Sequence, residues 1–587
     1  MSIENGHHRP DKWRFRFVYG IAFILFAVVA GRLFYLTVID KDFLQNQGEM
    51  RAVRTETIPA TRGMILDRRG EPLAVSAPTW TLVANPKKLW DMDQNPEKGE
   101  TPEQEINRLA DAMGGGHSWL TNRFEANKTR SFMYLKRQVS PREADQIMAA
   151  HVIGVTKRKE YKRFYPAGEM TAQVVGFTSI DDKGQEGLEL EYNSELQGSP
   201  GKRSYIKDLS GNAIRPIGQD VPARPGENIQ LSIDMRLQYL AYRELKAAVT
   251  ESRATSASAV ILDVKTGEIL AMVNQPSYNP NDRSTLDYDE LRNRAVIDLF
   301  EPGSTMKPFT VSAALMSGQY NTESIVNTSP GYLRVGRFTI RDDGNYGKIN
   351  LEKLLEKSSN VGASKIAFSL PPDSIWNVDH SLGFGSSVGI GFPGEVSGVL
   401  PTHSRWRPAE LATLSYGYGL SVSTLQLAQA YMTLANGGYR VPVTIFKQDA
   451  PPKGKQVIPR TVAKSVVKML EGVVLHGSGK LAQVPGYQIA GKTGTVHVVG
   501  NDGYQYDEYN AIFAGIAPAS DPRLVMVVMI HNPKGRNYYG GEVAAPVFSR
   551  VMRGALRTLN IPPDMPDGLR EVKLDSKKVP FRVAQDN

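Results

Sequence analysis

A serine and a lysine three positions apart are the first candidates for chemistry in this sequence. Ser304 and Lys307 follow Pro302 and Gly303 and begin an apolar run that predicts a helix. At this spacing both side chains share one face of the first helical turn. An amine whose pKa is lowered by burial or by another cation can take a proton from a hydroxyl beside it. The pair therefore predicts a nucleophile, Ser304, with Lys307 as its general base.

The Ser-x-x-Lys pattern alone carries little weight, because it recurs elsewhere in the chain. The other copies are Ser199 with Lys202, Ser204 with Lys207, and Ser465 with Lys468. What distinguishes the copy at Ser304 is the polar residues that follow it along the chain.

Two further groups of polar residues follow in order. Ser358 and Asn360 come after a short predicted helix, and an extended backbone there would point both side chains the same way. Lys492, Thr493, Gly494 and Thr495 lie in a run typical of a strand. If they gather in one cleft, these groups supply a nucleophile, a base, a proton relay, an amide holder and a carboxylate clamp.

Other motifs in the chain are interpreted as structural. A second Lys-Thr-Gly, at 265–267, predicts a hairpin turn, where glycine serves the backbone. The Gly-x-Ser-x-Gly at 385–389 is followed by more glycine and by Pro393. These residues disfavour the helix that must follow the serine in a nucleophile elbow. The 9 histidines show no metal-binding spacing and the chain has 0 cysteines, so we expect no metal and no thiolate nucleophile.

The elements that must position these groups begin after an apolar segment. Residues 17–39 predict one helix, interrupted by a single charge at Arg32 and long enough to cross a bilayer. A cleaved signal peptide is the alternative, but the apolar run continues past the small residues at which cleavage would occur. Basic residues precede the helix, which predicts a cytoplasmic N-terminal tail at 1–16 and a catalytic part outside the cytoplasm.

Beyond the helix the predicted secondary-structure pattern changes twice along the chain. Residues 40–225 read as short strands with many turn signals, which predicts a β-rich pedestal. Residues 226–565 alternate strand and helix patterns, including a strand at 228–234, a helix at 235–249 and a hairpin at 256–273, which predicts a mixed α/β sheet covered by helices. Residues 566–587, rich in charge, predict a C-terminal tail.

Length and composition limit the alternatives. With 587 residues the chain is too long for one core, and 41% apolar with 22% charged residues is ordinary for folded proteins. The net charge of +9 is a weak indication of an anionic partner. The basic stretch at 157–165 contains Glu160 and no recognition motif, so we interpret it as the solvated face of a hairpin and expect no nucleic-acid partner.

Taken together, the sequence resembles the class B penicillin-binding proteins. Their three signatures match Ser304 to Lys307, Ser358 to Asn360 and Lys492 to Gly494, in the family's order. Segments 62–74, 184–193, 293–310, 416–431 and 538–548 extend the resemblance over nearly all of the chain beyond the anchor. The sequence around Ser304 is most similar to that of the division-specific, FtsI-type peptidoglycan D,D-transpeptidases. An elongation-specific relative, or a non-catalytic β-lactam receptor or division scaffold, is the alternative.

This resemblance implies a fold and a mechanism. The fold is a transpeptidase sandwich, a five-stranded antiparallel sheet with helices on both sides. The mechanism is attack by Ser304 on a stem pentapeptide, with Lys307 as base and Lys492 keeping that base neutral. Ser358 relays the proton and Asn360 holds the donor's amide. Other implied roles are an oxyanion hole from the N–H groups of Ser304 and Thr495, carboxylate binding by Thr493 and Thr495, and space for the substrate at Gly494.

The resemblance also implies partners and a location. The substrates are peptidoglycan stem peptides, β-lactams are trapped on the serine, and no cofactor is needed. A polytopic, FtsW-type membrane glycan polymerase and other division proteins dock through the membrane helix and residues 40–225. Arg62 and Arg69 are candidates for that surface, with a salt-bridged structural role as the alternative. The implied location is the inner membrane, crossed once, with a periplasmic catalytic domain.

Overall fold

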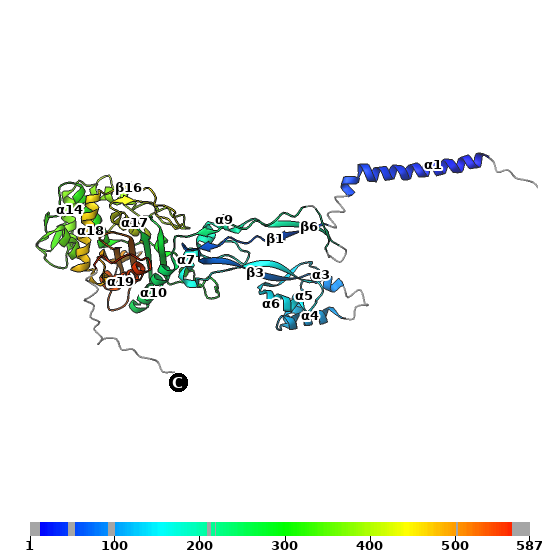
Figure 1. Cartoon of the computed structure of the whole chain (residues 1–587), viewed down its shortest axis with the longest axis horizontal. Helices are drawn as coiled ribbons and strands as arrows, with labels where there is room; N and C mark the ends of the chain where they lie inside the picture. The colour runs from blue at the N-terminus through cyan, green and yellow to red at the C-terminus, as the bar shows by residue number, and fades with distance from the viewer. Residues whose placement is uncertain are drawn as a thin grey trace, which may run out of the picture. The chain divides into compact units, whose positions relative to one another are not determined.

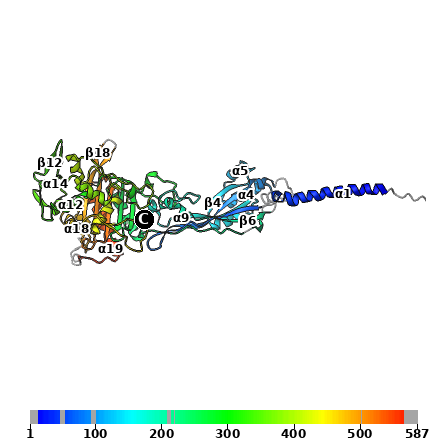
Figure 2. The same cartoon turned by 90° about the horizontal axis from the view of Figure 1, so that it is seen from above.

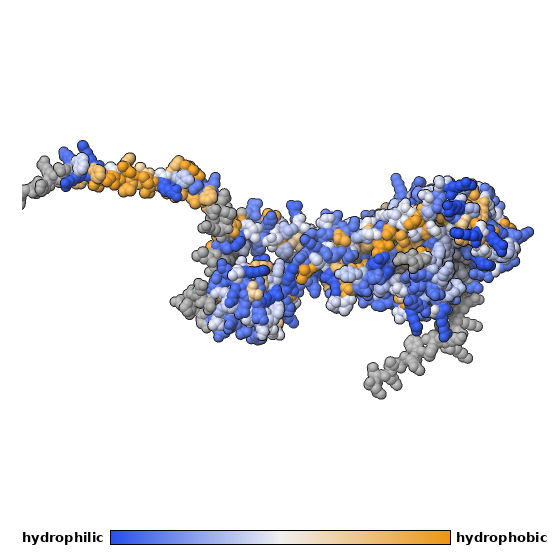
Figure 3. Space-filling view, turned by 180° about the vertical axis from the view of Figure 1, so that it is seen from behind, coloured by the Kyte–Doolittle hydropathy of each residue, from blue (hydrophilic) through white to orange (hydrophobic). Residues whose placement is uncertain are grey.

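The N-terminal helix is the simplest element of the computed structural model, which describes residues 12–44, 53–91, 100–207, 213–217, 219–500 and 503–565. Helix α1 (Lys12–Phe34) continues as one π-helical turn to Ile39, and its apolar side chains are exposed along its length (Figure 3). It is long and apolar enough to cross a membrane. The predicted helix at 17–39 is therefore present and begins five residues earlier. The predicted C-terminal tail and residues 1–11 lie outside the described residues.

By its internal contacts the chain divides into two compact units, residues 1–60 with 198–225 and residues 61–197 with 226–587. In the smaller unit, β1 (Val53–Ile58), β6 (Gly201–Lys207) and β7 (Ala213–Pro216) form an antiparallel sheet. Each unit combines segments that are distant in sequence, so neither unit corresponds to one of the predicted domains. The predicted domain bounds at 40–225 and 226–565 therefore stay a prediction.

The larger unit contains a second sheet near its beginning. Its strands are β2 (Ile65–Leu66), β3 (Pro72–Ala84), β4 (Met133–Val139), β5 (Val155–Phe164) and β8 (Ile229–Gln230). The basic stretch at 157–165 lies almost wholly on β5, which pairs with β3. Residues such as Lys159 and Lys162 are at least partly exposed there, but Arg163 and Tyr165 are buried and the partner strand β3 is distant in sequence. The predicted solvated hairpin face is therefore only partly correct.

Helices also occur in this part of the chain, between β3 and β8, although turn signals dominate the sequence there. They are α3 (Pro86–Trp90), α4 (Pro102–Ala112), α5 (His117–Glu125), α6 (Pro141–Met148), α7 (Ala172–Val175), α8 (Gly187–Glu191) and α9 (Asn193–Gln197). The prediction of short strands alone was incomplete. Thr101 and Ser140 cap α4 and α6, each followed by a proline at the first helical position, so the start signals were present in the sequence.

A buried ion cluster joins segments of this region. Glu189 accepts hydrogen bonds from Arg62 and Arg163, each at 2.6 Å, and the Arg62 and Glu189 side chains are inaccessible to solvent. Arg62 also donates to Asn193 Oδ1 at 3.0 Å. Arg62 therefore has the structural role that was the alternative to partner binding, while Arg69 is exposed.

The central sheet of the larger unit has five antiparallel strands in the order β10-β9-β19-β18-β17. They are β9 (Ser256–Asp263), β10 (Ile269–Gln275), β17 (Ala490–Gly500), β18 (Gly503–Ala517) and β19 (Leu524–His531). Their side chains alternate between two cores. Helices α10 (Met235–Ser252) and α19 (Gly540–Thr558) lie on one side of the sheet, and α17 (Thr424–Ala435) and α18 (Arg460–Leu475) lie on the other (Figure 1). Ile261 belongs to the first of the two cores and Val260 to the second. The predicted mixed α/β fold, with helices on both faces of a five-stranded antiparallel sheet, is confirmed.

The remaining elements lie between β10 and α18, in the part of the chain that holds the first two motifs. The helices are α11 (Arg294–Ile297), α12 (Lys307–Met316), α13 (Leu351–Lys357), α14 (Asn360–Ser369), α15 (Ser374–Leu382) and α16 (Pro408–Ser415). The short strands are β11 (Ile325–Asn327), β12 (Tyr332–Val335), β13 (Phe338–Arg341), β14 (Lys348–Asn350), β15 (Tyr439–Arg440) and β16 (Lys455–Gln456). Helices α12 and α14 are in contact (Figure 2), which brings the motifs that begin them together.

Candidate active site

Ser304 lies in a 3₁₀ turn, η5 (Gly303–Met306), which runs directly into α12. The prediction of one α-helical turn was therefore close but not complete. Gly303 has φ +54°, and a Cβ there would lie 2.2 Å from Val496 Cγ1 on β17. Only glycine satisfies both the backbone angle and this close approach. The turn is further held by Tyr431, whose hydroxyl donates to Thr305 O at 2.8 Å.

The Lys307 amine is the centre of the site. Its Nζ lies 2.9 Å from Ser304 Oγ, 3.1 Å from Ser358 Oγ, 2.5 Å from Ser358 O and 2.7 Å from Asn360 Oδ1. The last two oxygens are carbonyls, which can only accept. A neutral amine has two N–H groups for these carbonyls and a lone pair left for a hydroxyl proton. The contacts therefore fit an uncharged Lys307 that can accept a proton from Ser304 or Ser358.

Ser358 and Asn360 do not lie on the extended backbone that the sequence interpretation assumed. Ser358 ends α13 in the left-handed region, at φ +55°, and Asn360 begins α14. A sharp turn, not a strand, brings the two side chains to Lys307. The expectation of an extended segment was wrong because the ends of two helices meet at this position.

Asp342 holds this turn and was not among the predicted residues. Its carboxylate accepts from the Ser359 hydroxyl at 2.5 Å and from the backbone N–H groups of Asn360 and Val361 at 2.6 and 2.9 Å. A carboxylate at a helix start is stabilised by the helix dipole. No motif in the sequence pointed to Asp342, because it lies outside the three signatures.

Lys492 joins the site from the edge strand β17. Its Nζ donates to Ser358 Oγ at 3.0 Å and to Thr493 O at 3.1 Å. The hydroxyl of Ser358 is thus shared by two buried lysines, and a continuous chain of contacts runs from Ser304 through Lys307 and Ser358 to Lys492. Ser304 itself is partly exposed.

Burial lowers the pKa of both lysines. The pKa of Lys307 lies well below its usual value, first because the group is buried and second because of the positive charge of Lys492. The negative charges of Asp342 and Asp343 oppose this and raise it. Burial lowers the pKa of Lys492 to about 7. Both amines therefore lose their protons more readily than exposed lysines do, as general-base chemistry requires.

The last three predicted residues follow Lys492 on β17, where side chains alternate between faces. A Cβ on Gly494 would lie 3.0 Å from both Pro302 O and Thr305 Cγ2, so this glycine lets the nucleophile's turn pack on the strand. Thr493 Oγ1 lies 2.6 Å from Ser478 Oγ, and Thr495 Oγ1 accepts from Gly540 N at 2.9 Å. Their carboxylate-binding role stays a prediction, and Ser478 is a neighbour that the sequence did not reveal.

The remaining motif copies have structural partners of their own. Lys468 forms an ion pair with Glu471, and Ser204 Oγ lies 3.0 Å from Thr55 Oγ1 in the small sheet. The second Lys-Thr-Gly is the turn between β9 and β10, with Gly267 at φ +72°. The Gly-x-Ser-x-Gly segment lies in a loop, as predicted.

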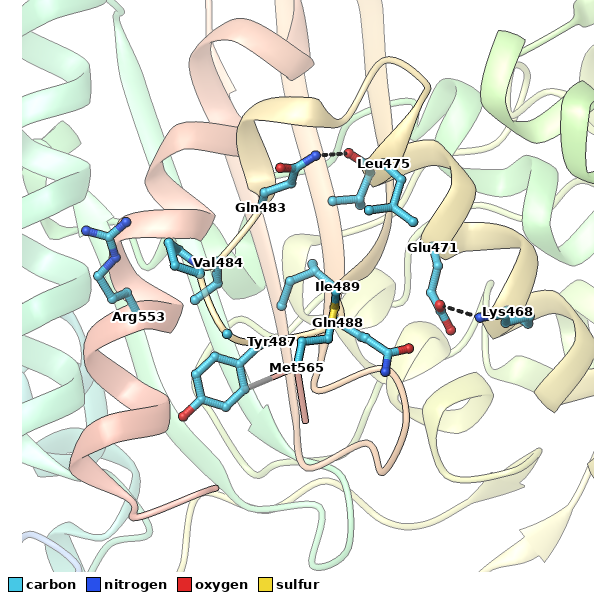
Figure 4. A pocket seen from close by; sticks show the side chains of 13 residues that line it. Lys468, Glu471, Leu475, Gln483, Val484, Tyr487, Gln488, Ile489, Arg553 and Met565 are labelled. Atoms are coloured by element: carbon cyan, nitrogen blue, oxygen red, sulfur yellow. Dashed lines mark hydrogen bonds and ion pairs between the residues drawn. The ribbon is translucent and has the colours of Figure 1, made fainter. Parts of the chain in front are cut away.

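A largely apolar pocket of about 590 Å³ lies between α18 and the segment 483–489 (Figure 4). Lys468 and Glu471 form an ion pair at its rim, and Gln483 donates to Val474 O at 3.0 Å. Met565 closes one side, where its N–H donates to Gly486 O at 2.9 Å. None of the predicted site residues lines this pocket, so it is separate from the chemistry at Ser304.

Comparison with known proteins agrees with this geometry. Residues 257–553 match the family model described as the penicillin-binding protein transpeptidase domain, and residues 57–231 match the penicillin-binding protein dimerisation domain. The chain belongs to the penicillin-binding protein transpeptidase family. The resemblance drawn from the three motifs is thereby confirmed.

Curated relatives of this transpeptidase extend over almost its whole length. Peptidoglycan D,D-transpeptidase FtsI of Escherichia coli is 43% identical over 559 residues, covering 95% of this chain and 94% of the relative. The probable peptidoglycan D,D-transpeptidase PbpC of Pseudomonas aeruginosa is 42% identical over 553 residues, covering 94% and 96%.

Solved structures show the same similarity. The transpeptidase domain of Burkholderia pseudomallei penicillin-binding protein 3 is 43% identical with a TM-score of 0.53, covering 57% of this chain and 98% of that one. A peptidoglycan synthetase from Bifidobacterium adolescentis is 26% identical with a TM-score of 0.69, covering 88% and 98%. The FtsI-type resemblance is confirmed by the curated FtsI relative, which matches nearly the full length of the chain.

Proposed function

We propose that this protein is a septal peptidoglycan D,D-transpeptidase of the FtsI type, which crosslinks stem peptides through an acyl-enzyme on Ser304 and is acylated by β-lactams. The observation that carries the proposal is the shared position of Lys307 Nζ, 2.9 Å from Ser304 Oγ and 3.1 Å from Ser358 Oγ. Family membership and the FtsI relatives support the same activity.

In the first half-reaction, Ser304 Oγ attacks the carbonyl carbon of the penultimate D-Ala residue of the donor stem. The hydroxyl proton passes to Lys307 Nζ as the C–O bond forms, because the neutral amine has a free lone pair at this position. Backbone N–H groups of Ser304 and Thr495 stabilise the negative oxygen of the tetrahedral intermediate. Asn360 holds the amide of the donor.

Collapse of the intermediate breaks the peptide bond to the terminal D-Ala. The leaving amine needs a proton, which the Ser358 hydroxyl donates while it is reprotonated by Lys307. Lys492 contacts the same hydroxyl, and its positive charge disfavours a proton on Lys307, so the proton moves toward the leaving group. Thr493 and Thr495 hold the terminal carboxylate, and free D-Ala departs.

In the second half-reaction, the amine of a neighbouring stem peptide attacks the ester carbonyl on Ser304. The attacking nitrogen loses a proton through Ser358 and Lys307, and Ser304 Oγ takes a proton as the ester bond breaks. The products are a new amide crosslink and the free enzyme. A β-lactam follows only the first half, because its ring opens without releasing a leaving group from the site.

Labelling with a fluorescent penicillin tests the assignment of the nucleophile. The Ser304→Ala variant should lose covalent labelling completely, and mass spectrometry of the wild-type protein should find the adduct on the peptide that contains Ser304. Ser465→Ala, in a Ser-x-x-Lys copy on α18, is the matched control and should label normally. Labelling that persists in Ser304→Ala would refute the assignment.

The cellular context is part of the same proposal. Helix α1 anchors the protein in the inner membrane, with the basic N-terminal residues in the cytoplasm and the transpeptidase in the periplasm. An FtsW-type glycan polymerase and other division proteins are its partners. Fusing a periplasm-active and a cytoplasm-active reporter to the C-terminus checks the orientation, and only the periplasm-active reporter should be active.

Complementation of a strain depleted of its division transpeptidase separates catalysis from scaffolding. The wild-type gene should restore septation and Ser304→Ala should not. Restoration by Ser304→Ala would show that the protein acts as a non-catalytic division scaffold.

A further inference from the structure

A carboxylate lies three residues before the nucleophile and has no use in the mechanism above. Glu301 Oε1 accepts from Gly419 N at 2.8 Å, and the Tyr504 hydroxyl donates to both carboxylate oxygens, at 3.1 and 3.0 Å. Glu301 makes no contact with Ser304 or Lys307 among the hydrogen bonds of the described residues. Its position and partners therefore require another explanation.

Among the residues that the structure describes, no cation forms an ion pair with Glu301. The nearby cations, Arg292 and Arg294, bind Asp298 instead, at 2.5 and 3.0 Å. Burial raises the pKa of Glu301, and the hydrogen bonds from Gly419 and Tyr504 oppose this and lower it. A half-buried carboxylate of this kind is a site where a ligand's positive charge would be stabilising.

Tyr504, which contacts this carboxylate, is the first of three tyrosines that lie in a row. The ring centroids of Tyr416 and Tyr418 lie 5.6 Å apart, and those of Tyr418 and Tyr504 lie 6.1 Å apart. Burial, and then the charge of Glu301, raise the pKa of Tyr416 and of Tyr418 to about 12, which places both phenols within the field of the carboxylate. Aromatic rings beside a carboxylate form an environment that favours an alkylammonium group, through charge pairing and cation–π contact.

A pocket opens at the same carboxylate. It has a volume of about 630 Å³, and its lining includes Glu301, Gly419 and residues 497–499 of β17. Arg292 and Arg294 also line it, with their charges paired to Asp298, while Tyr416, Tyr418 and Tyr504 lie outside its lining. Tyr504 pairs with Val499 at the far end of β17, the strand that carries Lys492. A chain lying along the exposed edge of β17 from Ser304 would therefore bring a side chain to Glu301. The pocket is large enough for the side chain of a peptide.

We propose that Glu301 and the three tyrosines near it form a binding site for the side-chain ammonium group of a peptidoglycan stem peptide. This inference rests on the proposed function, because transpeptidation needs stems with a free amine. Donor and acceptor stems both carry that amine before they are joined. In both stems the group that would bind is an alkylammonium on the side chain of a diamino-acid residue. Either the donor stem or the acceptor stem could supply it.

Glu301→Gln in the full-length, detergent-solubilised protein tests this site, with penicillin acylation of each variant as the reference rate. In the donor arm, a stem pentapeptide ending in D-Ala-D-Ala is offered with its side-chain amine free or acetylated, and release of D-Ala is measured. In the acceptor arm, an amine-free D-alanyl thioester acylates Ser304, and a stem tripeptide with a free amine competes with water for the acyl-enzyme. Acetylating that amine removes the nucleophile, so the acetylated tripeptide is the blank of this arm.

We expect Glu301→Gln to lower kcat/KM about tenfold for the free-amine peptide in one arm, as the loss of a charged hydrogen bond implies. The acetylated donor should react at the same rate with both proteins. A loss in the donor arm identifies the donor's amine, and a loss in the acceptor arm identifies the acceptor's. Glu395→Gln, which removes another carboxylate bound to backbone N–H groups, is the control and should change neither arm.

Two results would overturn the inference. Equal losses for the free and the acetylated donor peptides would mean that Glu301 only shapes the loop. Slower hydrolysis of the penicillin adduct in Glu301→Gln, with no dependence on a peptide amine, would make Glu301 a group that activates water. Failure of the proposed function is distinguishable from both, because it would appear as absent penicillin labelling of Ser304 in the wild-type protein.

Discussion

Lys307 and Lys492 share one hydroxyl, that of Ser358, at 3.1 and 3.0 Å from their amine nitrogens. Two lysines this close, both buried, cannot both carry a full charge without a large penalty. The arrangement biases Lys307 toward its neutral form beside the nucleophile, and its consequences can be measured.

Replacing Lys492 should shift the pH dependence of acylation. Lys307 acts as a base only when unprotonated, so the rate should rise with pH through its folded pKa and then level off. Lys492→Met removes a positive charge that lowers this pKa, so the rise should move to higher pH. The plateau should also fall, on the order of 10²-fold, because proton transfer through Ser358 is weakened. The second-order rate constant for penicillin acylation, measured against pH, checks this.

Lys480→Met removes an exposed lysine from the same region and serves as the control for Lys492→Met. Its pH profile should match that of the wild type. An unshifted acid limb in Lys492→Met would contradict the electrostatic coupling even if the rate fell.

Replacing Asp342 should shift the same profile in the opposite direction. The negative charge of Asp342 raises the pKa of Lys307, so Asp342→Asn should lower it and move the rise in rate to lower pH. The variant also weakens the hydrogen bonds that the Ser359 hydroxyl and the first N–H group of α14 donate to residue 342. We therefore expect the acylation rate on the plateau to be about tenfold lower. The same acylation assay measures both effects. A shift to higher pH would rule out this account.

Gly303 should tolerate no side chain. Gly303→Ala places a Cβ 2.2 Å from Val496 Cγ1 and puts alanine at φ +54°, which costs about 1 kcal/mol in the backbone alone. Displacement of Ser304 should slow acylation on the order of 10²-fold. Adding Val496→Ala removes the clash but not the backbone strain, so the double variant should recover part of the rate. No recovery would mean that the contact with Val496 is unimportant.

Asp379 should lower the free energy of unfolding at pH values above its unfolded-state pKa. This carboxyl on α15 is fully buried, neither oxygen has a hydrogen-bond partner among the described residues, and burial raises its pKa well above the usual value. A raised folded pKa means that stability falls as pH rises from the unfolded-state pKa of about 4 through the folded pKa. At neutral pH, Asp379→Asn should therefore increase the free energy of unfolding by about 1–3 kcal/mol. The thermal midpoint should rise accordingly.

The gain from Asp379→Asn should disappear at acid pH, below the unfolded-state pKa, where both states of the wild type hold the proton. Thermal unfolding of the two proteins at neutral and acid pH gives the comparison. A variant that is less stable at every pH would indicate that the carboxyl has a partner it cannot lose.

The sequence by itself determined much of this protein. Ser304, Lys307, Ser358, Asn360 and Lys492 were predicted as a group from residue type, spacing and order, and the structure brings them together. The apolar anchor, α10, and the hairpin of β9 and β10 followed from local periodicity, which depends only on neighbouring residues.

Only the tertiary structure decided how these parts meet. The left-handed turn at Ser358, the support from Asp342, the need for Gly494 beneath the nucleophile's turn and the hydrogen bonds from Gly419 and Tyr504 to Glu301 all depend on contacts between distant segments. Burial and the charge of a remote lysine set the pKa of Lys307, and neither is a property of the residues next to it in the chain. Desolvation and long-range packing are decided by the whole fold, which is why no local pattern could reveal them.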